Sequence, residues 1–203
     1  MKQLFWVLTI IISTTTPHLA QEATGLDKQL QKSIVAFEKG QVAKAERLLD
    51  NLISKEGSYA PAYVWKGKCL QEFEEYQPAY EAYYTACQLE PNVAIHWLAL
   101  ADFKSSLGSL TIRKPAACGD CGKQFLPLNG ERPTAAAYFA SALEDYKKAI
   151  ALDGELAEAY YQLGLTHAAL GALEEACSAM QTAQELGYQA AVPYQKEHCT
   201  NKH

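Results

Sequence analysis

Hydrophobic and polar positions repeat along the chain at a long, regular interval. Ala60-Pro-Ala-Tyr63 is followed by Ala94-Ile-His-Trp97, and Ala157-Glu-Ala-Tyr160 begins a third copy. The interval between the second and third copies is nearly twice the interval between the first and second. The pattern therefore predicts a repeated unit that is opened once by an insertion almost as long as the unit itself.

Each copy also places small residues near large ones at helical spacing. A small residue follows the aromatic by four positions, and an alanine further on precedes a large apolar residue by four. The first set is Gly67, Ala101 and Gly164, and the second is Ala79 with Tyr83, Ala142 with Tyr146, and Ala176 with Met180. A small residue at a crossing lets two helices approach to about 8–10 Å. Each unit is therefore expected to be an antiparallel pair of helices.

These units resemble the tetratricopeptide repeat (TPR), whose period of about 34 residues matches the interval from Tyr63 to Trp97. The resemblance rests on Tyr160-x-x-Leu163-Gly164, on Ala79-x-x-x-Tyr83 with Pro91 at the end of the unit, and on Trp97 in the family's tryptophan position. It implies an all-α, antiparallel helix-pair solenoid of about four units with a C-terminal capping helix and one irregular loop insert. The expected repeats are 26–59, 60–93, 94–156 with the insert at 109–134, and 157–188, followed by a cap at 189–199.

The resemblance further implies a concave groove lined by the first helix of each unit, where family members typically bind peptides or extended partner segments. The implied groove residues are Leu30, Ile34, Phe37, Val64, Lys68, Gln71, Ile95, Leu98, Asp102, Tyr161, Leu165 and Ala168. Leu98, Tyr161 and Leu165 have a second interpretation, as side chains packed under the terminal segments. Lys68 stands nearly alone as a cation, so a clamp for a partner's C-terminal carboxylate is not expected.

The first twenty residues have the layout of a signal peptide. Lys2 precedes an apolar stretch from Leu4 to Ile12, and a polar stretch then ends on Ala20. This apolar stretch is far shorter than the roughly 20 residues that a membrane-spanning helix needs. Cleavage after Ala20 and a periplasmic or secreted location are therefore expected, with no stable membrane insertion afterwards; a short uncleaved anchor is the alternative.

Composition narrows the class of partner. The chain has 203 residues, 49% hydrophobic and 20% charged, which fits one folded domain over 21–203. The net charge is −5, and no basic stripe marks a nucleic-acid surface. A protein or peptide partner is expected; the oligomeric state is left open.

Catalytic motifs are absent from the sequence: it contains no HExxH, GxSxG, Walker or dinucleotide-binding motif. His167 is expected to be a buried core histidine. Glu144 with Asp145, and Glu174 with Glu175, are expected on solvated helix faces. Tyr80 and Tyr84 fall off the buried stripe, which leaves a stacking platform for sugars or bases as the alternative to a packing role. The chain is expected to be a non-catalytic scaffold.

The insert is rich in proline and glycine, which predicts a structured loop from Ser109 to Thr134, with Thr134 as the N-cap of a helix over 135–152. Inside it, Cys118-Gly-Asp-Cys121 suggests a zinc knuckle, a redox dithiol or a disulfide staple. A structural zinc needs four ligands, and the others would have to come from Cys69, Cys87 or His96. Redox chemistry needs a stabilised thiolate, and no helix begins beside the pair. No cofactor is therefore expected, and a staple is favoured.

Six cysteines in an exported chain can form three disulfides. Cys69 and Cys87 are offset by roughly 9 Å along their helices, at about 1.5 Å per residue, which disfavours a bridge between them. Cys177 lies opposite the expected cap helix, where Cys199 would fall, so this pair is predicted to be bonded. Cys118 is expected to bond with Cys121, with links to Cys69 or Cys87 as the alternative.

The sequence leaves two alternatives to the scaffold function. The first is a metal- or thiol-dependent envelope protein in which Cys118 and Cys121 perform the chemistry. The second is a subunit that only completes a larger assembly.

Overall fold

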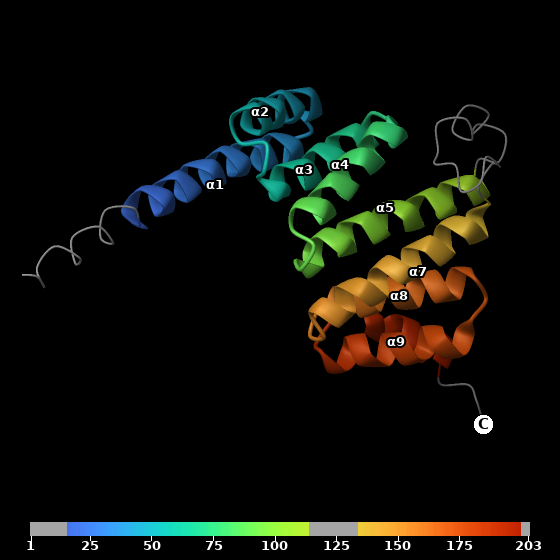
Figure 1. Cartoon of the computed structure of the whole chain (residues 1–203). Helices are drawn as coiled ribbons and strands as arrows, with labels where there is room; N and C mark the ends of the chain where they lie inside the picture. Colours follow the sequence, from blue (N-terminus) through green and yellow to red (C-terminus); the bar gives the residue numbers. More distant parts are fainter. Residues whose placement is uncertain (1–15, 114–133, 200–203) are drawn as a thin grey trace, which may run out of the picture. The chain divides into compact units, whose positions relative to one another are not determined.

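The protein is helical throughout the part that a computed structural model describes, residues 16–113 and 134–199 (Figure 1). The helices are α1 (Thr16–Glu38), α2 (Val42–Lys55), α3 (Ala60–Glu72), α4 (Tyr76–Leu89), α5 (Ala94–Arg113), α7 (Ala135–Leu152), α8 (Ala157–Ala169), α9 (Leu173–Glu185) and α10 (Ala191–Tyr194), and a π-helical turn follows at Gln195–Cys199. No strand occurs in these ranges. The predicted all-α fold of helix pairs is confirmed.

The chain divides into two compact units at Gly57. In the first unit, α1 and α2 pack against each other. Ser33 and Ala36 of α1 are buried, as are Ala45, Leu49 and Leu52 of α2, which recur every three or four residues as expected of a helix that buries one face. Lys55 Nζ donates a hydrogen bond to Gln29 Oε1 at 3.3 Å and joins the two helices at their open end.

The second unit consists of three helix pairs, α3 with α4, α5 with α7, and α8 with α9 (Figure 1). One hydrophobic core runs through the first two pairs to the start of α8 and contains the buried aromatic side chains of Tyr83, Phe103 and Tyr146. A separate cluster around Met180 of α9 forms the core of the C-terminal end. The first helices of the three pairs, α3, α5 and α8, are neighbours in sequence order along one side. We call the surface that these three helices form the first-helix face.

Small residues sit where the paired helices cross, as predicted. A Cβ atom at Gly67 would lie 2.8 Å from the Tyr83 ring, and one at Gly164 would lie 3.0 Å from the Met180 methyl group. Gly108 of α5 meets the Phe139 ring of α7 in the same way, at 2.7 Å. The close approach of each pair therefore depends on the missing side chain.

Helix α5 corrects the predicted start of the insert. It continues to Arg113, whereas a loop was expected from Ser109. The extra turn directly follows the buried residues Leu107 and Gly108, and the Thr111 hydroxyl within it donates a hydrogen bond to the Leu107 carbonyl oxygen at 2.8 Å. The other boundary is confirmed, because Thr134 Oγ1 accepts a hydrogen bond from the Ala137 N–H at 3.2 Å and α7 spans 135–152. Residues 114–133 lie outside the described ranges.

The C-terminal segment covers the last helix pair. Ala191 is buried beside Met180 and Ala183 of α9, and Tyr188 packs on Tyr161 with ring centroids 4.9 Å apart. The predicted disulfide between Cys177 and Cys199 is present, with their Cα atoms 5.6 Å apart. It fixes the end of the π-helical turn to α9.

The predicted leader overlaps α1 only in part. Cleavage after Ala20 would fall inside α1 of the uncut chain, and residues 1–15 lie outside the described ranges. Among the described helices, none has both the length and the apolar content needed to cross a membrane.

Candidate functional site

A pocket of about 310 Å³ opens on the first-helix face, between α5 and α8. Helix α5 contributes one carboxylate and three hydroxyl groups, α7 contributes two aromatic rings, and α8 contributes an amide and two apolar side chains. The lining residues are Asp102, Ser105, Ser106 and Ser109 of α5, Phe139 and Tyr146 of α7, and Gln162, Leu165 and Ala169 of α8. Helix α5 thus supplies only polar groups to the pocket, whereas α7 and α8 supply most of its apolar surface together with the Tyr146 hydroxyl and the Gln162 amide.

Asp102 supplies the carboxylate of this pocket. The Tyr146 hydroxyl donates a hydrogen bond to its Oδ1 atom at 2.8 Å. Burial raises the pKa of Asp102 from 3.8 to about 6, and nearby Glu158 adds to that rise; the Tyr146 hydrogen bond and the charge of Lys68 oppose it. The protein therefore keeps a carboxylate in a place that disfavours its ionised form.

A polar network links the pocket to the preceding helix pair. The Tyr83 hydroxyl donates to Gln71 Oε1 at 3.2 Å, and Gln71 Nε2 approaches Ser106 Oγ at 3.5 Å. Because these contacts span α3, α4 and α5, they hold the amide of Gln71 on the first-helix face. On the other side, Ser105 Oγ lies 3.2 Å from Thr166 Oγ1 of α8.

The structure brings three predicted groove residues to this site: Asp102 and Leu165 line the pocket, and Gln71 reaches it through Ser106. Lys68 is half-buried on α3, with its Nζ atom 4.2 Å from the Trp65 ring centroid. Tyr161 packs on Tyr188 in the C-terminal core, as its second interpretation proposed.

Two groove predictions need correction. Leu98 is 2% exposed and Val64 is 9% exposed, and both belong to the hydrophobic core of the second unit. Each helix buries a broad apolar stripe, and these two positions lie within it, so neither side chain can contact a partner directly. Ile95, by contrast, is 49% exposed at the first turn of α5.

The remaining groove predictions lie on other surfaces. Leu30, Ile34 and Phe37 are half-buried residues of α1 in the first compact unit. Ala168 is half-buried near the end of α8. That these four residues contact a partner stays a prediction.

Sequence reasoning missed most of the pocket lining. Ser105, Ser106 and Ser109 follow Asp102 by three, four and seven positions, a spacing that places all four on one side of a helix. That polar stripe was readable from the sequence, but the expected loop start at Ser109 cut it short. Tyr146 and Phe139 were not identifiable as lining residues, because they reach the pocket from the second helix of the pair.

A buried ion pair corrects the expected solvation of Asp145. Lys104 Nζ lies 2.5 Å from Asp145 Oδ2, and both side chains are nearly buried. Burial raises the pKa of Asp145, and the Lys104 ammonium opposes that shift. Asp145 faces α5 rather than water, whereas its neighbour Glu144 is exposed and pairs with Lys147 at 3.0 Å.

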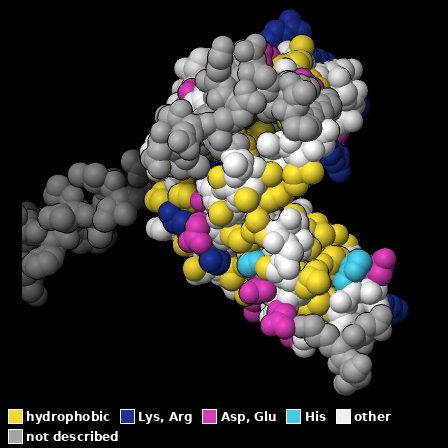
Figure 2. All heavy atoms as spheres, turned by 90° about the vertical axis from the view of Figure 1, so that its right-hand side faces the viewer, with side chains coloured by type: hydrophobic (Ala, Val, Ile, Leu, Met, Phe, Trp, Pro, Cys, Tyr) yellow, Lys and Arg dark blue, Asp and Glu magenta, His cyan; other side chains and the backbone are white. Residues whose placement is uncertain are grey.

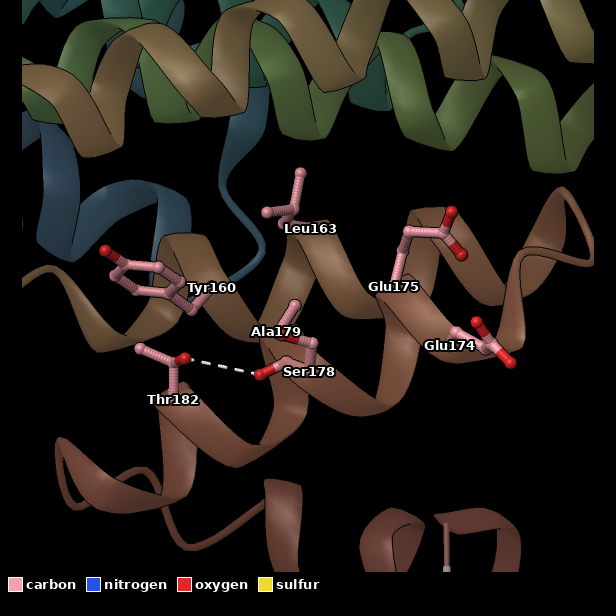
Figure 3. A pocket seen from close by; sticks show the side chains of 7 residues that line it. All are labelled: Tyr160, Leu163, Glu174, Glu175, Ser178, Ala179 and Thr182. Carbon is pink, nitrogen blue, oxygen red and sulfur yellow. Dashed lines mark hydrogen bonds between the residues drawn. The ribbon is translucent and has the colours of Figure 1, made fainter. Parts of the chain in front are cut away.

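A second pocket, of about 420 Å³, lies between α8 and α9 (Figure 3). Tyr160 and Thr182 stand at one end and Glu174 and Glu175 at the other. Both glutamates are exposed, as predicted, and the Thr182 hydroxyl is already bonded to the Ser178 carbonyl oxygen at 3.2 Å. This pocket has no buried ionisable group comparable to Asp102 among its described lining residues.

Exposed apolar side chains gather at the turn between α8 and α9. Leu165, Leu170 and Leu173 are 36%, 38% and 52% exposed. Figure 2 shows hydrophobic side chains beside acidic ones on the lower part of the molecule, where these two helices lie. Leu165 connects this surface to the pocket of Asp102.

Cys69 and Cys87 are buried, and neither forms a disulfide with another described cysteine. Burial raises the pKa of Cys87 to about 12, so its thiol stays protonated at neutral pH. Cys118 and Cys121 lie outside the described residues. The three interpretations of this pair, a disulfide staple, a zinc site and a redox dithiol, therefore stay predictions. Within the described ranges, no three metal-binding side chains come together.

Other candidate residues have structural roles. His96 is buried, with Nε2 bonded to Glu90 at 2.8 Å. His167 is half-buried, less than expected, and burial lowers its pKa. Tyr80 and Tyr84 stack on each other, with ring centroids 5.7 Å apart and planes 8° apart, so each covers a face of the other.

Comparisons with known proteins agree with this architecture. A sequence-family model described as tetratricopeptide repeat matches residues 60–93 and 157–186. A second family model, described as TPR repeat, matches residues 139–171. The crystal structure of TTC0263, a thermophilic TPR protein of Thermus thermophilus, is 19% identical with a TM-score of 0.61, over 80% of this chain and 74% of that one. No curated protein matches the chain.

Structures of MamA are also similar. One is 19% identical with a TM-score of 0.58, over 87% of this chain and 86% of that one. Another, MamA 41-end from Desulfovibrio magneticus RS-1, is 18% identical with a TM-score of 0.56, over 85% and 86%. At such identities the likeness shows the fold alone. The matched segments and the three helix pairs show that this chain contains tetratricopeptide repeats and has their fold.

Proposed function

We propose that this protein is an exported, non-catalytic scaffold that binds an extended polypeptide segment along its first-helix face. TPR proteins typically bind other proteins, and the fold is a usual one for interaction scaffolds. A fold alone does not define a function, so the proposal rests on a site. The observation that carries it is the pocket between α5 and α8, which opens on this face.

The chemistry of the pocket suits a polypeptide backbone. Every residue of an extended segment presents an N–H donor and a C=O acceptor that lose water on binding and need replacement partners. The amides of Gln71 and Gln162 can donate and accept, as can the serine hydroxyls of α5. Leu165 and Ala169 provide apolar contact for a side chain beside them.

The size of the pocket favours the same class of partner. A volume of about 310 Å³ is at the low end for ligand sites, which run from roughly 300 to 1,000 Å³. It suits a single side chain of a longer segment better than a large cofactor. The neighbouring first helix α3, with Gln71 and Lys68, extends the polar surface beyond the pocket.

The test is a selection of peptides from a random phage-displayed library against the purified, disulfide-bonded chain. Ala169→Phe fills the pocket from an exposed helical position, and Ala151→Phe makes the same change at an exposed position of α7 outside the lining. Selected peptides should bind the wild type and the Ala151→Phe variant alike and lose at least tenfold in affinity for Ala169→Phe. Failure to select any peptide, or equal binding to both variants, would contradict the proposal.

Export is the other part of the proposal. It is supported by the charged and apolar pattern of residues 2–20 and by the Cys177–Cys199 disulfide, since such bonds persist in oxidising compartments. Expression in a bacterial host followed by fractionation and intact-mass measurement tests it. The expected species is periplasmic and begins at Gln21. Recovery of only the uncut chain from the cytoplasm would overturn this part.

A further inference from the structure

The pocket on the first-helix face has an uneven charge. Asp102 is its one ionisable group that is charged at neutral pH, and no lysine, arginine or histidine is among its described lining residues. Outside the lining, Lys68 and Glu158 act on Asp102 with opposite signs. The pocket therefore offers a negative group that no adjacent cation of the described chain neutralises by an ion pair.

One oxygen of this carboxylate is left for a ligand. Oδ1 accepts the hydrogen bond from Tyr146, and no other described residue donates to Asp102. Within the described ranges, His96 Nδ1 is the one side-chain polar atom that is both buried and without a partner. Oδ2 of Asp102 must therefore be accessible, and Asp102 lines the pocket.

We propose that this pocket is the specificity site of the scaffold and takes a lysine or arginine side chain of the bound polypeptide, an inference that rests on the proposed function. The positively charged end lies beside Asp102, and the serine hydroxyls of α5 accept its remaining hydrogen bonds. The aliphatic stem packs on the exposed side chains of Leu165 and Ala169, because lysine and arginine stems cover apolar surface while their charged ends stay among polar groups.

The energetics of Asp102 support this assignment. A partly buried carboxylate without an ion pair is costly to keep ionised, and a bound cation offsets that cost. The hydrogen bond from Tyr146, itself fully buried, holds the carboxylate in place before any ligand arrives. A site prepared in this way loses little entropy on binding.

The experiment uses the peptides selected from the random library. Their sequences should share a lysine or arginine, and Asp102→Asn should weaken their binding by about ten- to hundredfold, as expected for loss of a charge-assisted hydrogen bond. Asparagine keeps the shape of the side chain and an acceptor for Tyr146. Glu144→Gln, which removes the same charge from an exposed position, should leave the affinity unchanged.

A second test changes the peptide instead of the protein, so that its result does not depend on whether the Asp102→Asn variant folds. Replacing the shared lysine by norleucine, or the shared arginine by citrulline, should weaken binding to the wild type but have little further effect on Asp102→Asn. Selected peptides that are sensitive to Ala169→Phe yet share no basic residue, or that bind Asp102→Asn as well as wild type, would overturn the specificity site and leave the scaffold standing. A selection that yields no peptide would overturn both.

Discussion

Lys104 and Asp145 form the buried ion pair that joins α5 to α7 in the helix pair interrupted by the insert. Removing one partner of such a pair leaves a buried charge, whereas replacing both with apolar residues can be neutral. Lys104→Met should therefore lower the free energy of unfolding by about 3 kcal/mol, and the double variant Lys104→Met/Asp145→Leu should recover most of it.

The measurement is urea unfolding of four proteins: the wild type, the single variants Lys104→Met and Asp145→Leu, and the double variant. Lys147→Met is the matched control, because it breaks the exposed pair with Glu144 and should cost less than about 1 kcal/mol. If Lys104→Met and Lys147→Met have equal effects, the pair does not behave as buried.

Asp102 should make stability depend on pH. Its pKa is raised to about 6 in the folded protein, above the ordinary 3.8, so the folded state binds more protons than the unfolded state between these values. Stability from this group is therefore highest below about pH 4 and falls as pH rises through 6. Asp102→Asn should remove that slope and stabilise the protein at pH 7 by on the order of 2 kcal/mol.

The comparison is made by chemical unfolding between pH 4 and pH 7.5, with Glu144→Gln as the charge-matched control. Subtracting the wild-type free energy of unfolding from that of each variant at every pH removes the contribution of the other titrating groups. One of these is Asp145, whose pKa is also raised by burial. An Asp102→Asn curve parallel to the wild type would show that burial does not raise the pKa of this carboxyl.

Helix crossings depend on glycine to different degrees. An added methyl group at Gly67 would meet the rigid Tyr83 ring at 2.8 Å, whereas at Gly164 it would meet the flexible end of Met180 at 3.0 Å. Overpacking costs about 1–3 kcal/mol, and alanine regains up to about 1 kcal/mol of helix propensity. Thermal unfolding should show Gly67→Ala clearly destabilised and Gly164→Ala much less so. The reverse order would contradict this account of the crossings.

The C-terminal segment should depend on its disulfide. Cys177 and Cys199 have a sequence separation of 22, and closing a loop of this length contributes about 3 kcal/mol in the chain-entropy model. In the Cys177→Ser/Cys199→Ser variant, hydrogen exchange should become faster in α10 and α9, with α5 and α7 less affected. Unchanged exchange in α10 would mean that packing of Ala191 and Tyr188 suffices to hold the cap.

Much of this molecule was predictable from the sequence because repeats impose a strong pattern. Gly67 with Tyr83, Gly164 with Met180, the Thr134 cap and the Cys177–Cys199 bond all follow from local spacing or from the antiparallel order of neighbouring helices. The pocket was only partly predictable. Asp102 and Leu165 were identified correctly as lining residues. Tyr146 was not, because it lies on the second helix of its pair, and Leu98 and Val64 lie in the core instead of the groove.

These residues were not predicted correctly because the sequence does not define the rotation of each helix about its own axis. A helix position near the edge of the apolar stripe can face the core or the groove, and a small rotation of the helix decides between them. Asp145 shows the same limit, because nothing in its immediate sequence indicates the partner Lys104, which lies far away along the chain on α5. Contacts of this kind are set by how the helices of a pair meet, after the helices themselves are defined.

Binding of a selected peptide to the first-helix face can be mapped by amide NMR on the isotope-labelled chain. We expect chemical-shift changes concentrated in α3, α5 and α8, around Gln71, Asp102, Ser106 and Gln162, with α9 near Ser178 unaffected. Changes centred on Glu174, Glu175 and Ser178, the pocket between α8 and α9, would place binding elsewhere and contradict the assignment of the first-helix face.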